Sequence, residues 1–300
     1  MKRQFIAASI LLATVASAAA QEGAPDGQPH SWEIGLQRAF SPVAEQMHWF
    51  NSYILFFIIP VVVLVGALLA WVVFRFGASR NATPSQTSHN TVIEVVWTVA
   101  PVIVLILIAI PSFQLLTLQY NPPSDPEMTV KVTGYQWYWN YEYQPESGDG
   151  AEPAEAVAFD SYLLQDGDRA GAGKEDMAAY PRLLAVDNEL VVPVNTVVRV
   201  LATAGDVIHS FAVPSFGIKV DAVPGRMNEY WFSAEKEGMF YGQCSELCGK
   251  DHAFMPIAVR VVSKDQFDTW LSAAGTSVED ANKQLMAEIQ AADAVEVAGR

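Results

Sequence analysis

The first 120 residues contain two long apolar runs. Residues 49–76 carry no charged side chain between Ile54 and Phe74, and residues 92–120 form the second run. A helix of about 20 apolar residues is long enough to cross the hydrocarbon core of a bilayer. The pattern therefore predicts a hairpin of two transmembrane helices. Three prolines lie inside the two runs: Pro60, Pro101 and Pro111.

The segments before the first run have the pattern of an exported protein. Residues 1–20 begin with Lys2 and Arg3, continue through a short apolar core and end in small residues. This pattern is typical of a secretory signal peptide. The alternative, a first membrane helix, requires a longer apolar core. Residues 21–48 are polar and contain three prolines, so we expect an extended periplasmic arm.

The connection between the two runs predicts their orientation. Residues 77–91 and the flanking Arg75 provide two arginines, Arg75 and Arg80, and no acidic side chain. Loops with an excess of basic residues stay in the cytoplasm. We therefore expect a multi-pass protein of the bacterial inner membrane. Both mature termini and the large C-terminal part would lie on the periplasmic side.

From residue 121 the pattern changes to that of an all-β domain. Residues 128–143 are rich in β-branched and aromatic side chains, and turn residues separate the short runs that follow. This spacing favours an antiparallel sandwich or barrel over residues 121–275. Further strands are expected at residues 183–186, 190–192, 196–202, 209–213, 226–232, 238–243 and 257–262.

Two parts of this region do not follow the strand pattern. Residues 146–180 are rich in Gly, Ala, Asp and Glu, which we interpret as a surface insertion between strands. Residues 266–274 and 278–292 have helical character. The tail 276–300 is a candidate for mobility or processing.

Charge is distributed unevenly along the chain. The net charge is -15, and the first 120 residues carry five acidic and five basic residues, so the rest carries 28 acidic against 13 basic ones. An acidic surface aids solubility, and it also attracts a basic partner in a salt-dependent manner. Nucleic acid is excluded as a partner by the sign of the charge.

Residues 241–255 concentrate the candidate chemistry of the chain. Its two cysteines, Cys244 and Cys248, lie four residues apart, followed by His252 and Met255. Two cysteines of an exported protein can form a disulfide. Sulfur and imidazole together, however, are a soft ligand set that suits copper. Zinc is the rival, although structural zinc sites rarely use Met. His209 is the best candidate for a second imidazole, and two thiolates can bridge two copper ions that each bind one histidine.

This segment resembles the dinuclear copper (CuA) motif of cytochrome c oxidase subunit II. The resemblance rests on Cys-Ser-Glu-Leu-Cys-Gly-Lys-Asp-His-Ala-Phe-Met with His209 upstream, and it extends from about residue 40 to 270 through the Gln-Trp-Tyr-Trp segment at 136–139. It implies a cupredoxin-like Greek-key β-barrel behind the membrane hairpin. It also implies an electron-accepting subunit of a respiratory oxidase, which takes electrons from a c-type cytochrome and passes them to haem in subunit I.

The resemblance also assigns roles to single residues. It implies copper ligation by His209, Cys244, the Glu246 carbonyl, Cys248, His252 and Met255. The carboxylate of Glu246 would bind magnesium or manganese at the contact with subunit I, and the alternative for this side chain is a surface salt bridge. A proton-path role is implied for Glu94, whose alternative is a helix-end carboxylate favoured by the helix dipole.

Aromatic and acidic residues carry the expected docking surface. We expect Trp137 on a strand, where it faces the same side as Trp139, and buried packing is the alternative to its implied role as the point where electrons enter. The docking acids implied by the resemblance are Glu142, Asp187 and Asp206. Two other classes of function stay open: a membrane-tethered copper carrier, and an exported domain with a structural disulfide. A quinol oxidase subunit would share the fold but lack the cysteines.

Overall fold

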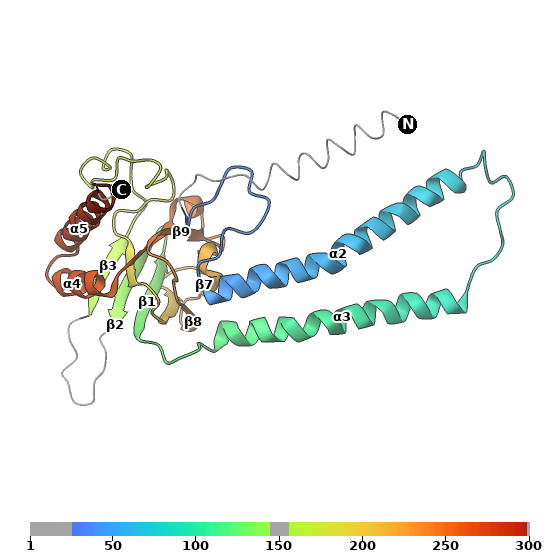
Figure 1. Cartoon of the computed structure of the whole chain (residues 1–300), viewed down its shortest axis with the longest axis horizontal. Helices are drawn as coiled ribbons and strands as arrows, with labels where there is room; N and C mark the ends of the chain where they lie inside the picture. The colour runs from blue at the N-terminus through green and yellow to red at the C-terminus, as the bar shows by residue number, and fades with distance from the viewer. Residues whose placement is uncertain (1–25, 145–155, 299–300) are drawn as a thin grey trace. The chain divides into compact units, whose positions relative to one another are not determined.

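The computed structural model describes residues 26–144 and 156–298 (Figure 1). The chain forms two compact units. One comprises Glu45–Asn121, and the other comprises the described residues up to Ala44 and from Pro122 onward. The predicted signal peptide lies outside the described residues, as does part of the predicted insertion.

Two long helices account for the apolar runs. Helix α2 spans Pro42–Arg75 and helix α3 spans Thr91–Tyr120, and both are long and apolar enough to cross a membrane. Helix α2 begins inside the segment that we expected to be an extended arm. The reason is local, because Ser41 accepts a hydrogen bond from the Ala44 amide at 3.1 Å and Pro42 follows at the first helical position. A serine cap with proline next to it is a favoured helix start.

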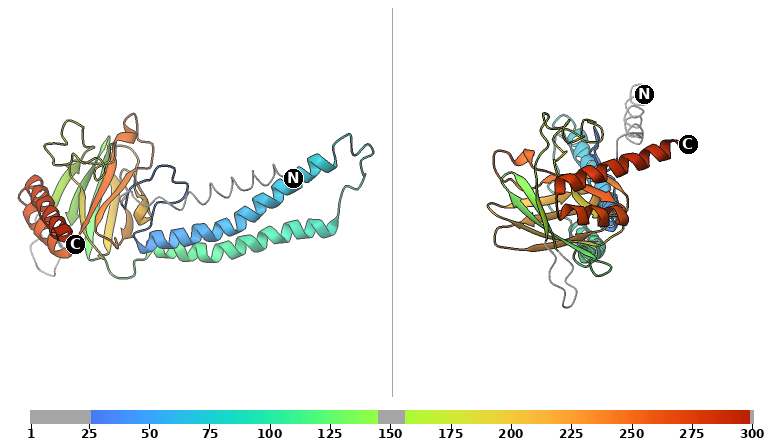
Figure 2. Two further views of the ribbon diagram at one scale, coloured as in Figure 1. Left: turned by 45° about the horizontal axis from the view of Figure 1, so that its top comes forward. Right: turned by 90° about the vertical axis from the view of Figure 1, so that its left-hand side faces the viewer.

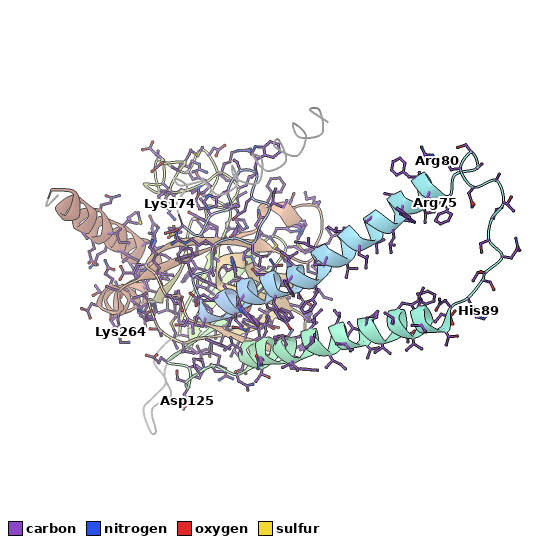
Figure 3. The ribbon with its side chains drawn as sticks, turned by 45° about the vertical axis from the view of Figure 1, so that its right-hand side comes forward. Arg75, Arg80, His89, Asp125, Lys174 and Lys264 are labelled. Carbon is purple, nitrogen blue, oxygen red and sulfur yellow. The ribbon has the colours of Figure 1, made fainter. Side chains whose placement is uncertain are left out.

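The two arginines of the orientation argument are Arg75, the last residue of α2, and Arg80, in the connection to α3 (Figure 3). Arg80 donates a hydrogen bond of 2.7 Å to the Phe74 carbonyl, one of the last carbonyls of α2. A cation at this position also interacts favourably with the negative end of the helix dipole. Arg80 therefore stabilises the end of α2 as well as adding positive charge to the loop.

A hydrogen bond between the two helices compensates for a proline. Pro111 has no N–H, so the carbonyl of Leu107, four residues earlier, has no donor within its own helix. The hydroxyl of Tyr53, on α2, donates to this carbonyl at 3.1 Å. A free carbonyl is costly in hydrocarbon. Tyr53 therefore makes Pro111 tolerable and holds the two helices together.

The second unit is a β-sandwich of two five-stranded sheets, with strand orders β3-β2-β1-β5-β8 and β4-β10-β9-β6-β7 (Figures 1 and 2). Its strands are β1 (Met128–Tyr135), β2 (Tyr138–Gln144), β3 (Val157–Ser161), β4 (Leu190–Pro193), β5 (Val198–Ala204), β6 (His209–Val213), β7 (Ile218–Ala222), β8 (Asn228–Phe232), β9 (Gly238–Cys244) and β10 (Pro256–Val262). The expected fold class, two apolar helices followed by an all-β domain, is confirmed. The sheets are not purely antiparallel, because β1 pairs with β5, and β4 with β10, in parallel.

The core lies between the two sheets. Along β2 the side chains of Trp139, Tyr141 and Tyr143 are buried while the residues between them are not. This period of two is the one expected for a strand with one covered face. In contrast, all seven residues of β10 are buried. The second sheet is therefore covered on its outer side as well.

Part of the predicted insertion provides this cover. Lys174 is buried and forms an ion pair with Glu189 at 2.7 Å, and Arg260 of β10 lies 3.3 Å from the same carboxylate. Arg260 also donates to the hydroxyl of Tyr180 at 3.1 Å. Buried charges are stable only when paired and hydrogen-bonded, as these are. The described part of the insertion is thus anchored to the sheet rather than displayed on its surface.

Several strand predictions need correction. Residues 183–186 form a turn, with Val186 in one isolated bridge to Leu163. Strands β3 and β7 were not predicted, because β3 lies within the Ala- and Glu-rich insertion and β7 alternates charged with apolar residues. Residues 128–143 form two strands separated by a turn at Gln136 and Trp137.

The C-terminal residues form two helices that pack side by side (Figure 2). These are α4 (Lys264–Ala274) and α5 (Val278–Ala298), and both fall where helical character was expected. Ala281 and Leu285 of α5 are buried in the main core. The Nε1 of Trp270 donates to Asn282 at 2.8 Å. The first half of α5 is therefore part of the domain, whereas processing of the tail stays a prediction.

We predict that Tyr53→Phe destabilises the helix pair. The Leu107 carbonyl loses its donor, and interhelical hydrogen bonds in membranes are worth about 0.6 to 1.7 kcal/mol. The free energy of unfolding of the chain in mild detergent, titrated with a denaturing detergent, measures this cost. In a Pro111→Ala background residue 111 has its own N–H, so the same Tyr53→Phe change should cost almost nothing. An equal cost in both backgrounds would show that the hydroxyl does not compensate for the proline.

Candidate metal centre

Neighbouring strands bring the predicted ligands together. His209 is the first residue of β6 and Cys244 the last of β9, and these strands pair with Phe211 opposite Cys244. Strands β9 and β10 form a hairpin, so the ligand loop, residues 245–255, returns to the point where it left. The Ser210 carbonyl accepts from the Ser245 amide at 2.9 Å, which joins the loop to β6 as well. The fold thereby brings His209 and Cys244, which are 35 residues apart in the sequence, next to each other.

The donor atoms form a compact cluster. The Sγ atoms of Cys244 and Cys248 lie 3.9 Å apart, and the Nδ1 of His209 lies 3.9 Å from the Sγ of Cys244. On the other side the Sγ of Cys248 lies 3.5 Å from both the Nδ1 of His252 and the Sδ of Met255. The thiols form no disulfide. The ligand atoms of His209 and the two cysteines all lie within 4.8 Å of one another.

Burial separates the cluster from solvent on most sides. His209, Cys244, Cys248 and Met255 are each at most 5% exposed, and His252 is half-buried. A set of soft donors that is mostly buried suits a permanently held metal. It does not suit a metal that must be handed over.

The thiols and the imidazole have displaced pKa values. Although burial disfavours the thiolate, hydrogen bonds with His209 and with the Glu246 backbone lower the pKa of Cys244 to about 7. Burial and the nearby Cys244 sulfur raise the pKa of Cys248 to about 12. Thiols ligate a metal as thiolates. A bound cation removes the repulsion between two adjacent thiolates, so this pair is arranged for a metal rather than for its own ionisation.

Asp206 and Gly134 hold the ring of His209. The Oδ1 of Asp206 lies 2.9 Å from the Nε2 of His209, which leaves Nδ1 directed at the sulfur. Although burial opposes its ionisation, hydrogen bonds from His209 and from two backbone amides lower the pKa of Asp206. A Cβ at Gly134 would lie 2.8 Å from the ring, so only glycine fits beside it. Ligating histidines are commonly oriented in this way by a carboxylate on the other nitrogen.

Trp137 lies against the ligand loop, but in a turn rather than on a strand. Tyr135 and Tyr138 pair as the last and first residues of β1 and β2, with Gln136 and Trp137 between them. A Cβ at Gly249, the residue after Cys248, would lie 3.0 Å from the Cζ2 of Trp137. The indole therefore lies close to the residue next to a ligand. Trp139 is instead buried, and its Nε1 donates to the Met255 carbonyl at 3.4 Å.

Gln136 connects the turn to both ligand segments, a role that the sequence did not reveal. Its backbone N–H donates to the Oδ2 of Asp206 at 2.7 Å, and its side chain donates to the Cys248 carbonyl at 2.7 Å. The second contact spans 112 residues, so no local pattern signals it. The only indication of this role in the sequence was that Gln136 stands next to Trp137.

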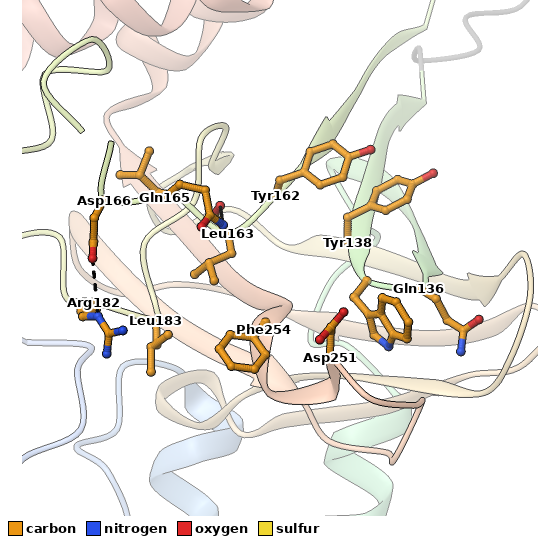
Figure 4. A pocket seen from close by; sticks show the side chains of 12 residues that line it. Gln136, Tyr138, Tyr162, Leu163, Gln165, Asp166, Arg182, Leu183, Asp251 and Phe254 are labelled. Atoms are coloured by element: carbon orange, nitrogen blue, oxygen red, sulfur yellow. Dashed lines mark hydrogen bonds and ion pairs between the residues drawn. The ribbon is translucent and has the colours of Figure 1, made fainter. Parts of the chain in front are cut away.

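A cleft of about 490 Å³ lies beside this turn (Figure 4). Its wall includes the side chains of Tyr138 and Tyr162, whose rings stack with centroids 4.6 Å apart. Asp251 and Phe254 of the ligand loop line it as well, and Arg182 lies opposite with its partner Asp166. The insertion thus borders the surface near Trp137.

The remaining acidic candidates lie in different environments. The Glu246 side chain is exposed, while its carbonyl lies 3.3 Å from the Sγ of Cys244. Glu142 forms an ion pair with Lys131 at 3.1 Å, and hydrogen bonds from Gln144 and Lys131 lower its pKa. Asp187 is half-buried and accepts from the Tyr162 and Asn188 amides, and burial raises its pKa.

Glu94 lies at the start of α3, in the other unit. Asn90 caps this helix by accepting from the amides of Val92 and Ile93, and Glu94 accepts from the Asn90 N–H at 3.1 Å. This reciprocal arrangement resembles a capping box. The carboxylate therefore has a structural contact, which is compatible with either role predicted for it.

Comparisons with known proteins cover most of the chain. The family model for the periplasmic domain of cytochrome c oxidase subunit II matches residues 128–262, and the model for its transmembrane domain matches residues 29–115. The chain is 45% identical over 261 residues to a probable cytochrome c oxidase subunit 2 of Rickettsia felis, covering 87% of this chain and 78% of that one. With the cytochrome c oxidase subunit 2 of Cereibacter sphaeroides it shares 44% identity over 281 residues, covering 89% of each chain.

A solved structure is also similar to part of the chain. The periplasmic domain of subunit II of the cytochrome oxidase of Bradyrhizobium japonicum is 55% identical, with a TM-score of 0.42, over 50% of this chain and 95% of that one. The family models cover both the apolar helices and the β-sandwich that holds the Cys-His cluster. The chain therefore belongs to the cytochrome c oxidase subunit II family.

Proposed function

We propose that this subunit accepts electrons from a c-type cytochrome at a dinuclear CuA centre and passes them to haem in subunit I. There oxygen is reduced to water and protons are pumped. The observation that carries the proposal is the buried cluster of two thiols, two imidazoles and a thioether, with donor atoms 3.5 to 3.9 Å apart. Soft sulfur with imidazole is the ligand set of copper sites.

Each ligand has its own part in the proposed centre. A pair of copper ions held by these residues would supply a site that takes up one electron with little movement of its ligands. Cys244 and Cys248 would hold both ions through their thiolates, and His209 and His252 would each hold one. Met255 and the Glu246 carbonyl would be weak further ligands. Asp206 and Gly134 keep the His209 ring from turning, so the ligand geometry is fixed in advance.

The burial of the ligands distinguishes this function from a copper carrier. A carrier must expose its ligands so that an acceptor can reach the metal. Here His209 is fully buried, and the thiols are nearly so. The donor set therefore favours electron transfer at a permanent metal centre.

Trp137 is proposed as the residue where electrons enter. Its ring lies close to Gly249, one residue from Cys248, so a short path through space and a few bonds separate it from the centre. The excess of acidic residues after residue 120 would attract a basic cytochrome. Glu142, Asp187 and Asp206 are the proposed docking acids. Asp206 has the additional task of orienting His209.

The remaining proposals concern the oxidase as a complex. The exposed carboxylate of Glu246 would bind magnesium or manganese at subunit I, because hard cations prefer oxygen ligands. The arginine-containing loop between α2 and α3 would face the cytoplasm. The β-sandwich and both mature termini would then lie on the periplasmic side of the bacterial inner membrane.

In the purified oxidase, we expect two copper ions that can be assigned to each copy of this subunit. Paramagnetic resonance should show one unpaired electron shared equally by both ions. The variant Met255→Leu should keep both ions but change the spectrum, because a weak axial ligand is lost. One copper ion per chain, or the spectrum of an isolated copper ion, would contradict the dinuclear assignment.

Replacement of Trp137 by Gln should slow reduction of the copper centre by cytochrome c at least about tenfold, equivalent to ~1.4 kcal/mol in activation free energy. The copper content should stay normal, because Trp137 provides no ligand. Stopped-flow spectroscopy measures the rate. Trp32→Gln is the matched control, since Trp32 is a 95% exposed tryptophan of the N-terminal arm. Equal rates in the two variants would mean that electrons enter elsewhere.

The proton role of Glu94 can be separated from its capping role. Glu94→Gln keeps an oxygen acceptor for the Asn90 N–H but cannot exchange a proton at neutral pH. Loss of the helix-end carboxylate charge alone should cost roughly 0.3 to 1 kcal/mol of stability and no activity. If Glu94 admits protons, Glu94→Gln should slow steady-state oxygen consumption while copper reduction stays fast. Unchanged oxygen consumption in this variant would assign Glu94 a structural role only.

A further inference from the structure

Lys250 lies over the face of Trp137. Its Nζ is 5.6 Å from the ring centroid and 3.7 Å from the Oδ2 of Asp251. A cation within about 6 Å of an indole face is attracted by the ring electrons. The Lys250 side chain is 78% exposed, so packing does not fix it in this place. The ammonium group therefore occupies one approach to the indole and can leave it.

The charge of Lys250 is opposite to the excess charge of its surroundings. The chain after residue 120 carries 28 acidic against 13 basic residues, which favours a basic partner. Asp206 is bonded to the Gln136 N–H next to Trp137, and Asp251 lines the cleft beside the same turn. A lysine paired with Asp251 and lying over Trp137 repels the kind of partner that these carboxylates attract.

A basic partner would use the same contacts that Lys250 uses. Its own lysine or arginine gains a cation–π contact only if the indole face is free. It gains a pairing with Asp251 only if that carboxylate is released. An exposed ion pair at 3.7 Å is weak, so Lys250 can be displaced at a small but finite cost.

We propose that Lys250 is a specificity-determining residue that competes with a basic side chain of the c-type cytochrome for the Trp137 face and the Asp251 carboxylate. The inference rests on the proposed function of Trp137 as the point where electrons enter. Competition weakens the complex with a basic cytochrome and shortens its lifetime. The oxidised cytochrome then leaves sooner. Fast release is needed at a site that accepts electrons one after another.

The test compares three variants of the intact oxidase with a basic c-type cytochrome as donor. Lys250→Gln removes the cation from the ring, and Lys250→Arg keeps one there. Lys264→Gln removes the same charge from the first residue of α4 (Figure 3). Steady-state oxygen consumption at a series of ionic strengths gives KM for each enzyme, and the copper spectrum confirms that the centre is intact.

We expect Lys250→Gln to lower KM at low ionic strength by about two- to fivefold, the factor to which an exposed cation–π contact corresponds. The difference should shrink as salt screens the charges. Lys250→Arg should restore a KM near that of the unmodified enzyme. Lys264→Gln should change KM much less, because it alters only the net charge.

Two results would overturn the proposal. If Lys250→Gln and Lys264→Gln change KM equally, Lys250 is an ordinary surface charge. If Lys250→Gln raises KM, Lys250 assists docking instead of competing with it. If Trp137 is not the point where electrons enter, the result is different. The cytochrome would then reduce the copper centre of the Trp137→Gln variant at the normal rate, whatever Lys250 does to KM.

Discussion

The site depends on the pairing of strands β6 and β9. This pairing fixes Phe211 opposite Cys244 and thereby brings His209, the first residue of β6, beside the thiol at the end of β9. The hairpin of β9 and β10 then returns Met255 to the same place. Because strand register is specified by which face is buried, a slip by one residue would turn His209 away from the sulfur. Ligand geometry is thus a consequence of the apolar core.

The same core explains why the ligand set is already ordered by the protein. Trp139 lies below the cluster, where it contacts the ring of His209 edge-on and donates to the Met255 carbonyl. Asp206, between β5 and β6, bonds both to the His209 ring and to the N–H of Gln136 in the β1–β2 turn, which completes the support. Two thiols and an imidazole packed together in a buried place influence one another's protonation, as their displaced pKa values indicate. Such a cluster could hold a metal ion.

Polar groups that burial would otherwise leave unsatisfied organise the rest of the molecule in a similar way. Tyr53 satisfies the Leu107 carbonyl that Pro111 leaves free between the apolar helices. In the β-sandwich unit, Glu189 binds both Lys174 of the insertion and Arg260 of β10. In both cases a group that would be costly alone becomes a connection between segments distant in sequence. The described part of the insertion is attached to the sheet through this ion pair.

The sequence by itself determined the apolar helices, the all-β class and the ligand residue types, because each depends on local pattern. Runs of apolar residues, alternation of period two and the spacing of Cys244, Cys248, His252 and Met255 are all visible without tertiary contacts. Only the tertiary structure decided that Trp137 lies in a turn against Gly249, that Gln136 bonds to Cys248, and that Lys250 covers the indole. It also decided that α5 packs into the core, although its composition resembles a solvated tail. These features depend on contacts between residues far apart in sequence, and strand pairing and burial create such contacts without leaving a local signal.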